Sequence, residues 1–214
     1  MTKAEMWSQS TQAIFLGVLL YSIAGAVYPI FSFINSLASA GAKLAKMAGG
    51  SSVDFSAIAI ICYILLAAII FGYYLYLKGL SDFEKVNEPA DAENVKKLRT
   101  ATILVLAGMG VIFIFGFIPF AGFVGGLIGG ILNIVAYILM LLAFSALKSS
   151  STFPSTARSG AGMLFVAMIL LLCAALLGLI PFIGGILNII ISAIAFVMVI
   201  IGWLKIKNAA TEVA

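Results

Sequence analysis

Residues 160–204 read GAGMLFVAMILLLCAALLGLIPFIGGILNIIISAIAFVMVIIGWL, and none of these positions carries a charged side chain. The stretch is about twice as long as the roughly 20 apolar residues that a helix needs to cross the hydrocarbon of a bilayer. Pro181 lies near its middle. Proline lacks a backbone N–H and therefore fits the first turn of a returning helix. The stretch predicts two membrane-spanning helices joined by a turn.

The rest of the chain has the same character. Of its 214 residues, 64% are hydrophobic and 9% are charged, whereas about 25% are charged in an ordinary soluble domain. The apolar runs are continuous rather than alternating, which favours helices over a β-barrel. The predicted fold class is therefore all-α: a polytopic helical membrane protein whose residues 1–214 form a single membrane domain. We expect six transmembrane helices at residues 13–31, 55–77, 101–118, 123–147, 160–180 and 182–204.

Parts of the sequence recur. Ile118-Pro119-Phe120 is followed by GGILNI at 129–134, and Ile180-Pro181-Phe182 is followed by the same six residues at 184–189. Two segments that follow spans also share a Lys-x-x-Ser-x-Phe pattern, at 78–83 and 148–153. These matches predict three direct-repeat hairpins of one orientation, the first of them divergent. The hairpins cover about 11–80, 95–150 and 158–207, with cytoplasmic loops at about 78–99 and 148–159.

The basic residues indicate the topology. The net charge is +4, and the lysines and arginines gather before the odd-numbered spans and after the even-numbered ones. Only Lys43 and Lys46 fall on the other side. The positive-inside rule then places both termini in the cytoplasm of a cell membrane, with a bacterial or archaeal cytoplasmic membrane favoured. This account of the charge makes a nucleic-acid partner unnecessary, so the lipid bilayer is the expected partner.

Three lysines end the second helix of a predicted hairpin, each after a leucine: Lys78, Lys148 and Lys205. A lysine at a helix C-terminus meets the negative end of the helix dipole, and its ammonium reaches the lipid headgroups. We interpret these three as membrane anchors.

The sequence offers little for catalysis. It has no histidine, which removes the usual proton shuttle, the commonest neutral metal ligand and the base of most catalytic triads. Cys62 and Cys173 fall inside spans and are expected to be buried structural thiols. No acidic residue lies in the middle of a span. We therefore expect neither an enzyme nor a cofactor or metal site.

Two asparagines are the most notable polar residues within spans. Asn133 and Asn188 occupy matching positions of the two GGILNI segments. An amide in hydrocarbon needs a hydrogen-bond partner, so the pair predicts contacts between helices, worth on the order of 0.5–2 kcal/mol each. Alternatively, they line a polar path together with Ser22, Tyr63 and Ser192.

Glycines suggest where helices pack closely. Gly122, Gly126 and Gly130 are spaced four residues apart, and Gly184 and Gly185 recur in the last hairpin. Small residues at this spacing let membrane helices approach one another. We expect these five glycines to lie at helix contacts.

Two further segments leave alternatives open. The polar stretch 78–99 contains Pro89, which we interpret as a break, and Asp91, which is suited to cap the helix that leads into the third span. Residues 32–49 form either an amphipathic helix on the outer leaflet or an extension of the first span, kinked at Pro29.

These observations favour a non-catalytic integral membrane protein that acts through helix packing, as a homo-oligomer or with other membrane proteins. The alternative is a small channel or transporter with a neutral polar path near Asn133 and Asn188. Proton-coupled transport normally needs an ionisable group within the membrane, and the spans contain no carboxylate or histidine.

Overall fold

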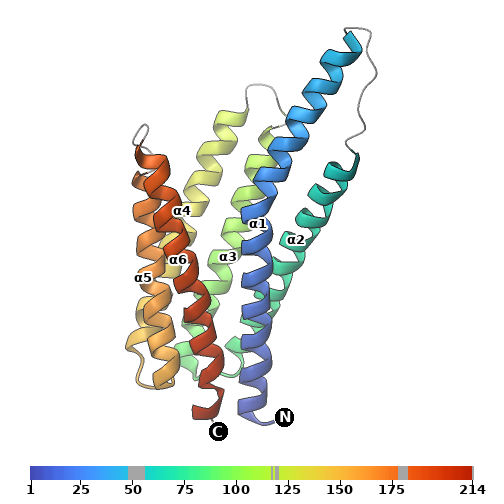
Figure 1. Cartoon of the computed structure of the whole chain (residues 1–214). Helices are drawn as coiled ribbons and strands as arrows, with labels where there is room; N and C mark the ends of the chain where they lie inside the picture. Colours follow the sequence, from blue (N-terminus) through green and yellow to red (C-terminus); the bar gives the residue numbers. More distant parts are fainter. Residues whose placement is uncertain (48–55, 117, 119–120, 178–182, 214) are drawn as a thin grey trace. The chain divides into compact units, whose positions relative to one another are not determined.

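The computed structural model describes residues 1–47, 56–116, 118, 121–177 and 183–213. These residues are almost entirely helical and contain no strands (Figure 1). The elements are α1 (Lys3–Met47), α2 (Ser56–Glu84), α3 (Pro89–Gly116), α4 (Gly122–Ser149), α5 (Ser155–Leu177), α6 (Ile183–Asn208) and the short 3-10 helix η1 (Ala209–Glu212). The prediction of an all-α fold with six long apolar helices is confirmed, because each of α1 to α6 is long and apolar enough to cross a membrane.

The apolar helices keep much of their surface uncovered. Phe123 of α4 is 76% exposed and Ile189 of α6 is 71% exposed, although both are large apolar side chains. Water would penalise such a surface. The hydrocarbon of a bilayer would not, so the exposed side chains are compatible with a lipid environment.

The described chain divides into two compact units, and each is described by itself. One unit comprises residues 16–76, the greater part of α1 and α2. The other comprises residues 1–15 and 77–214, with the start of α1, the end of α2 and the remaining helices. In the larger unit α3 packs against α4, α4 against α5, and α5 against α6, while η1 contacts α5 and α6.

Three pairs of consecutive helices, α1–α2, α3–α4 and α5–α6, each contain a close approach between two glycines. The pairs are Gly17 with Gly72, Gly108 with Gly129, and Gly160 with Gly202. A β-carbon added to one member of each pair would lie 2.5–2.9 Å from the carbonyl oxygen of its partner. No real side chain tolerates that distance to backbone, so the glycines are what let the two helix backbones touch. The repeat organisation itself stays a prediction.

The polar stretch 78–99 differs from the predicted loop. It is helical except at residues 85–88, because α2 continues to Glu84 and α3 begins at Pro89. Pro89 follows the non-helical residues 85–88 and is the first residue of α3, where the N–H it lacks would have had no helical partner. Asp91 lies within the first turn instead of capping it.

The two Lys-x-x-Ser-x-Phe segments also differ in conformation. Residues 78–83 are entirely helical, within α2, whereas α4 ends at Ser149 and residues 150–153 form the turn before α5. Pro154 explains the difference, since a proline disfavours helical geometry at the residue before it. The expectation that 78–83 forms a loop like 148–153 is wrong.

Residues 32–47 continue α1 beyond Pro29 as one helix. Of the two alternatives for this segment, the extension of the first span is therefore the one observed over these residues. Several expectations fall outside the described residues: the end of that segment at 48–49, and the turns at Pro119, Phe120, Ile180, Pro181 and Phe182.

Candidate functional site at the polar end

The charged residues of the larger unit gather at one end of its helices. We call this the polar end: the starts of α1, α3 and α5, the ends of α2, α4 and α6, and η1. It contains ten of the twelve basic and seven of the eight acidic residues of the chain. The start of α1 and the end of α6 lie side by side there (Figure 1). The polar end is thus where the chain presents ionic and hydrogen-bonding groups.

Trp7 is the centre of a buried aromatic cluster at the polar end. Its ring packs edge-on against Phe83 with the centroids 4.6 Å apart, and against Phe153 at 5.6 Å. All three side chains are at most 2% exposed. The Trp7 Nε1–H donates to the carbonyl oxygen of Ile206 at 2.8 Å. One side chain of α1 therefore contacts the end of α2, the α4–α5 turn and the end of α6.

The phenylalanines of the two Lys-x-x-Ser-x-Phe segments meet in this cluster. Phe83 and Phe153 are their last residues, and their rings lie 6.3 Å apart in an edge-on arrangement. The serines of the two segments are used differently. Ser81 accepts a hydrogen bond from Arg99, which also pairs with Glu84 at 2.9 Å, whereas Ser151 is exposed in the turn. The shared pattern therefore supplies one common contact, the packing on Trp7.

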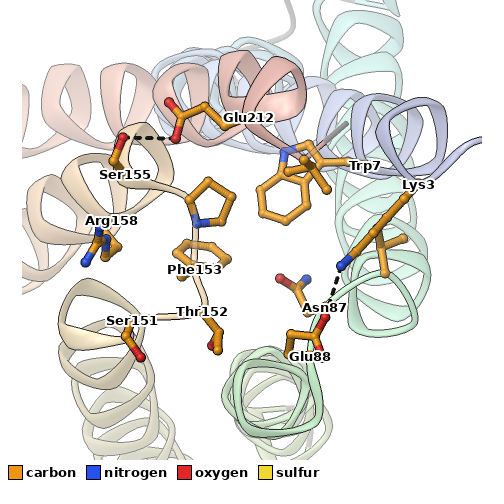
Figure 2. A pocket seen from close by; sticks show the side chains of 13 residues that line it. Lys3, Trp7, Asn87, Glu88, Ser151, Thr152, Phe153, Ser155, Arg158 and Glu212 are labelled. Atoms are coloured by element: carbon orange, nitrogen blue, oxygen red, sulfur yellow. Dashed lines mark hydrogen bonds and ion pairs between the residues drawn. The ribbon is translucent and has the colours of Figure 1, made fainter.

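A polar recess of about 330 Å³ lies beside the cluster. Trp7 and Phe153 line it together with Lys3, Glu88 and Arg158. Figure 2 shows Lys3 reaching toward Glu88, to which its ammonium pairs at 3.1 Å. The walls thus carry charges of both signs and several hydroxyl groups, without a concentration of either charge.

Glu212 closes another side of this recess from η1. Its carboxylate accepts a hydrogen bond from Ser155 Oγ at 3.0 Å (Figure 2). It also accepts one from the backbone N–H of Thr156 at 3.3 Å. These groups belong to the first turn of α5, where N–H groups lack helical partners. Hydrogen bonding from Thr156, and then from Ser155, lowers the pKa of the Glu212 carboxyl below its ordinary value. The C-terminal turn is in this way fastened to the start of α5.

Asp91 links two further elements of the polar end. It is 1% exposed, and its Oδ2 accepts a hydrogen bond from Thr152 Oγ1 at 2.7 Å. Thr152 lies in the α4–α5 turn and also contacts Ser150 Oγ at 2.9 Å. Because Asp91 is in the first turn of α3, its carboxylate lies near the positive end of that helix dipole. The contact fixes the turn to the start of α3.

The two asparagines that the sequence singles out lie in different surroundings. Asn133 is half-buried in α4, with its amide beside Gly108 of α3, 3.4 Å from where a β-carbon of that glycine would be. Asn188 is half-buried in α6, and its Oδ1 accepts a hydrogen bond from Ser192 of the same helix at 3.0 Å. The structure therefore brings Asn188 together with Ser192 and places Asn133 at a helix contact.

The other members of the suggested polar path lie in the smaller unit. Tyr63 of α2 is 73% exposed, and Ser22 of α1 is half-buried. None of the five residues lines the polar recess beside Trp7.

The glycines that contact another helix are not the ones predicted in α4. Gly125 and Gly129 face α3: a β-carbon on Gly125 would meet Cβ of Phe115, and one on Gly129 would lie 2.5 Å from Cγ1 of Ile112. Around Gly122, Gly126 and Gly130 nothing lies within 4 Å of an added β-carbon. Within the chain, the close contact is thus displaced by one residue from the predicted set. The surroundings of Gly184 and Gly185 lie outside the described side chains.

The three predicted anchors all belong to the polar end. The ammonium of Lys148 lies 3.7 Å from the ring centroid of Phe165 in α5, and that of Lys205 donates to Ser159 Oγ at 2.9 Å. Lys78 is exposed, and no contact of its ammonium with another described residue is observed. Two of the three lysines thus contact a neighbouring helix as well as reaching the surface.

Both thiols are free, but the expectation of burial within the chain is wrong. Cys62 is half-buried and Cys173 is exposed. Among the described residues, no group of three or more His, Cys, Asp or Glu is arranged to hold a metal ion. Comparison with known protein families, curated proteins and solved structures finds no match to this chain.

Sequence reasoning missed Trp7, which makes the most far-reaching contacts of the polar end. One signal was present: tryptophan is enriched at membrane–water boundaries, and Trp7 precedes the first apolar run. No comparable signal distinguishes Gly125 and Gly129 from the neighbouring glycines.

Proposed function

We propose that this chain is a multi-pass membrane protein that acts without catalysis, by packing against copies of itself or against other membrane proteins. Its six apolar helices would cross a bacterial or archaeal cytoplasmic membrane, with the polar end and both termini in the cytoplasm. The concentration of basic residues at the polar end supports this orientation. The exposed apolar side chains of the helices support insertion into lipid.

The observation that carries the proposal is the free glycine face of α4. Gly122, Gly126 and Gly130 lie one above the other on the helix, since residues four apart share a face. Nothing lies within 4 Å of a β-carbon added at any of them. The adjoining Phe123 and Leu127 are 76% and 53% exposed. In lipid, such a small-residue face permits the close approach of another helix.

Self-association in liposomes tests the proposal. Two portions of the protein with different fluorophores are reconstituted together, and energy transfer is followed as lipid dilutes the protein. We expect transfer in the wild type and its loss in Gly126→Leu, because the larger side chain holds the second helix away. Gly162→Leu is the matched control, since Gly162 of α5 likewise has nothing within 4 Å of an added β-carbon.

A partner of another kind would appear in the same preparation. Native mass spectrometry of the protein extracted with its lipid identifies bound copies or bound membrane proteins. Wild-type protein that is monomeric at every dilution and carries no bound protein overturns the proposal. Equal energy transfer in the wild type and Gly126→Leu overturns the role of the glycine face.

The alternative function, a small channel or transporter, rests on the half-buried amides of Asn133 and Asn188. Ion or solute flux into liposomes is the direct measurement. A flux that disappears in Asn133→Leu with Asn188→Leu would favour the polar path. If the flux is unchanged by both substitutions, the amides serve only as contacts between and within helices.

A further inference from the structure

A second recess of the polar end lies between α3 and α4, at the level where the polar start of α3 gives way to its apolar run. Its volume is about 240 Å³, and it is lined by Glu93, Lys96, Lys97, Thr100 and Leu139. Four of these residues come from consecutive turns of α3, and Leu139 comes from α4. The recess thus combines cationic groups, a hydroxyl and an apolar side chain from a neighbouring helix.

The two lysines differ in their contacts. The ammonium of Lys97 pairs with Glu93 at 3.3 Å and donates to Asn94 Oδ1 at 3.2 Å. Lys96 is exposed, with no hydrogen bond or ion pair to another residue in the described part of the chain. Glu93 is 70% exposed at its side chain, so its charge is well screened by water. The recess therefore offers a cation without an acidic partner beside a second cation.

Apolar surface continues from the recess along both helices. On α3, Ile103 follows Thr100 by one turn and is 51% exposed. On α4, Val135 precedes Leu139 by one turn and is 42% exposed. Because α3 and α4 pack against each other, this strip lies on two adjoining helices. The surface is cationic at Lys96 and apolar at Ile103. A ligand with an anionic head and a long apolar tail matches this arrangement.

We propose that the recess binds an anionic phospholipid, with its phosphate at Lys96, Lys97 and Thr100 and an acyl chain against Leu139, Ile103 and Val135. The proposal rests on the membrane insertion proposed above. Basic pockets between membrane helices on the cytoplasmic side are suited to anionic headgroups. The lysine stems can lie along apolar surface while their ammonium groups stay at headgroup level. Thr100 can donate its hydroxyl proton to a phosphate oxygen.

Photocrosslinking at Leu139 tests this site. The protein carrying benzoylphenylalanine in place of Leu139 is reconstituted in vesicles of one part phosphatidylglycerol to four parts phosphatidylcholine and irradiated, and mass spectrometry identifies the lipid adducts. We expect the ratio of phosphatidylglycerol to phosphatidylcholine in the adducts to exceed that of the vesicle by about five-fold, which corresponds to the roughly 1 kcal/mol of one basic residue near an anionic lipid. Excess inorganic phosphate should leave the enrichment unchanged, because the tail contributes to binding.

Two double variants distinguish lipid binding at the recess from attraction by the overall positive charge of the polar end. Lys96→Gln with Lys97→Gln should return the adducts to the mole fraction of the vesicle. Lys78→Gln with Lys85→Gln removes the same charge from the same end, outside the recess, and should preserve the enrichment. Adducts that show no enrichment in the wild type, or an enrichment lost equally in both double variants, overturn the proposal. A crosslink to protein instead of lipid at Leu139 overturns it as well.

Failure of the membrane proposal would look different. A second probe replaces Leu142 of α4, which is 57% exposed and lies outside the recess. Lipid adducts at position 142 without enrichment at 139 refute the lipid site alone. Absence of lipid adducts at both positions refutes membrane insertion of α4.

Discussion

Trp7 shows how one side chain can join elements that are distant in sequence. Its ring fills the space between Phe83 and Phe153, and its N–H satisfies a carbonyl near the end of α6. The last carbonyls of a helix have no helical partner. The indole therefore contributes both packing and a hydrogen bond that α6 cannot make for itself.

Replacing Trp7 separates these two contributions. Trp7→Ala should lower the free energy of unfolding by about 3–5 kcal/mol, because it leaves a cavity in a buried cluster. Trp7→Phe retains an aromatic ring and should lose less, with about 1 kcal/mol from the hydrogen bond. Unfolding in mixed micelles with increasing SDS measures both values. Equal losses for the two variants would contradict a separate contribution from the ring.

Glu212 predicts a pH dependence at the polar end. Its folded pKa is lowered by the hydrogen bonds from Thr156 and Ser155, so the contact stabilises the fold above the ordinary pKa of 4.5 and is lost as pH falls through the lowered value. A nitroxide on Val213→Cys, in a background lacking Cys62 and Cys173, should become mobile by electron paramagnetic resonance over that acidic range. Glu212→Gln should be mobile at every pH. A label whose mobility is independent of pH in the unaltered Glu212 background would refute the contact.

At the residue scale, the sequence predicts which chemical groups are present better than it predicts which side chains touch one another. The absence of histidine and the polar character of Asn133 and Asn188 are visible in the letters themselves. The meeting of Trp7 with Phe83 and Phe153 is not, because it depends on how three separate helix ends are brought together. Asp91 is predicted as a helix cap but lies in the first turn of α3. The sequence does not separate the two positions, because an acidic residue is favoured at both.

At the element scale, the length and hydropathy of the apolar runs are enough to predict the six long helices. Six long apolar helices were predictable because each span must satisfy its own backbone hydrogen bonds in hydrocarbon. The polar segment 78–99 was not, because Pro89 is compatible both with a loop and with the first position of a helix. The glycines that face α3 were also not predictable. Gly125 and Gly126 are neighbours in the sequence, and only the rotation of α4 about its axis decides which of them contacts α3.

The α3–α4 pair gives a direct test of that orientation. Gly129→Ala places a β-carbon 2.5 Å from Cγ1 of Ile112 and 2.9 Å from the carbonyl oxygen of Gly108. We expect a loss of about 1–3 kcal/mol in the free energy of unfolding, the usual cost of overpacking. Gly126→Ala adds the same atom in open space and should change stability by less than about 1 kcal/mol. A larger loss for Gly126→Ala in monomeric protein would contradict the packing of this pair.

At the scale of the whole molecule, charge separates one end of the helices from the other. Because ten of the twelve basic residues lie at the polar end, the proposed topology makes one prediction for all ten: they lie on the cytoplasmic side. The alternatives are therefore sharply distinct: the polar end faces the cytoplasm or it does not.

Single cysteines measure this orientation. In a background with Cys62→Ala and Cys173→Ala, we expect Ser151→Cys to react with a membrane-impermeant maleimide only after the membrane is opened. Lys43→Cys should react in intact cells, because the positive-inside rule places it outside. Detergent-solubilised protein, in which both positions should react, provides the control. The reverse pattern in intact cells would refute the proposed topology.

The hydrogen bond from Trp7 to Ile206 joins positions 199 residues apart in the chain. During synthesis the ribosome delivers Trp7 long before α6 exists, so the indole meets this acceptor only after α2 to α6 have been made. Bringing together positions this far apart costs loop-closure entropy before the hydrogen bond forms. The polar end is therefore completed only after translation has nearly finished, and a chain arrested before α6 would carry its Trp7 indole N–H without this acceptor.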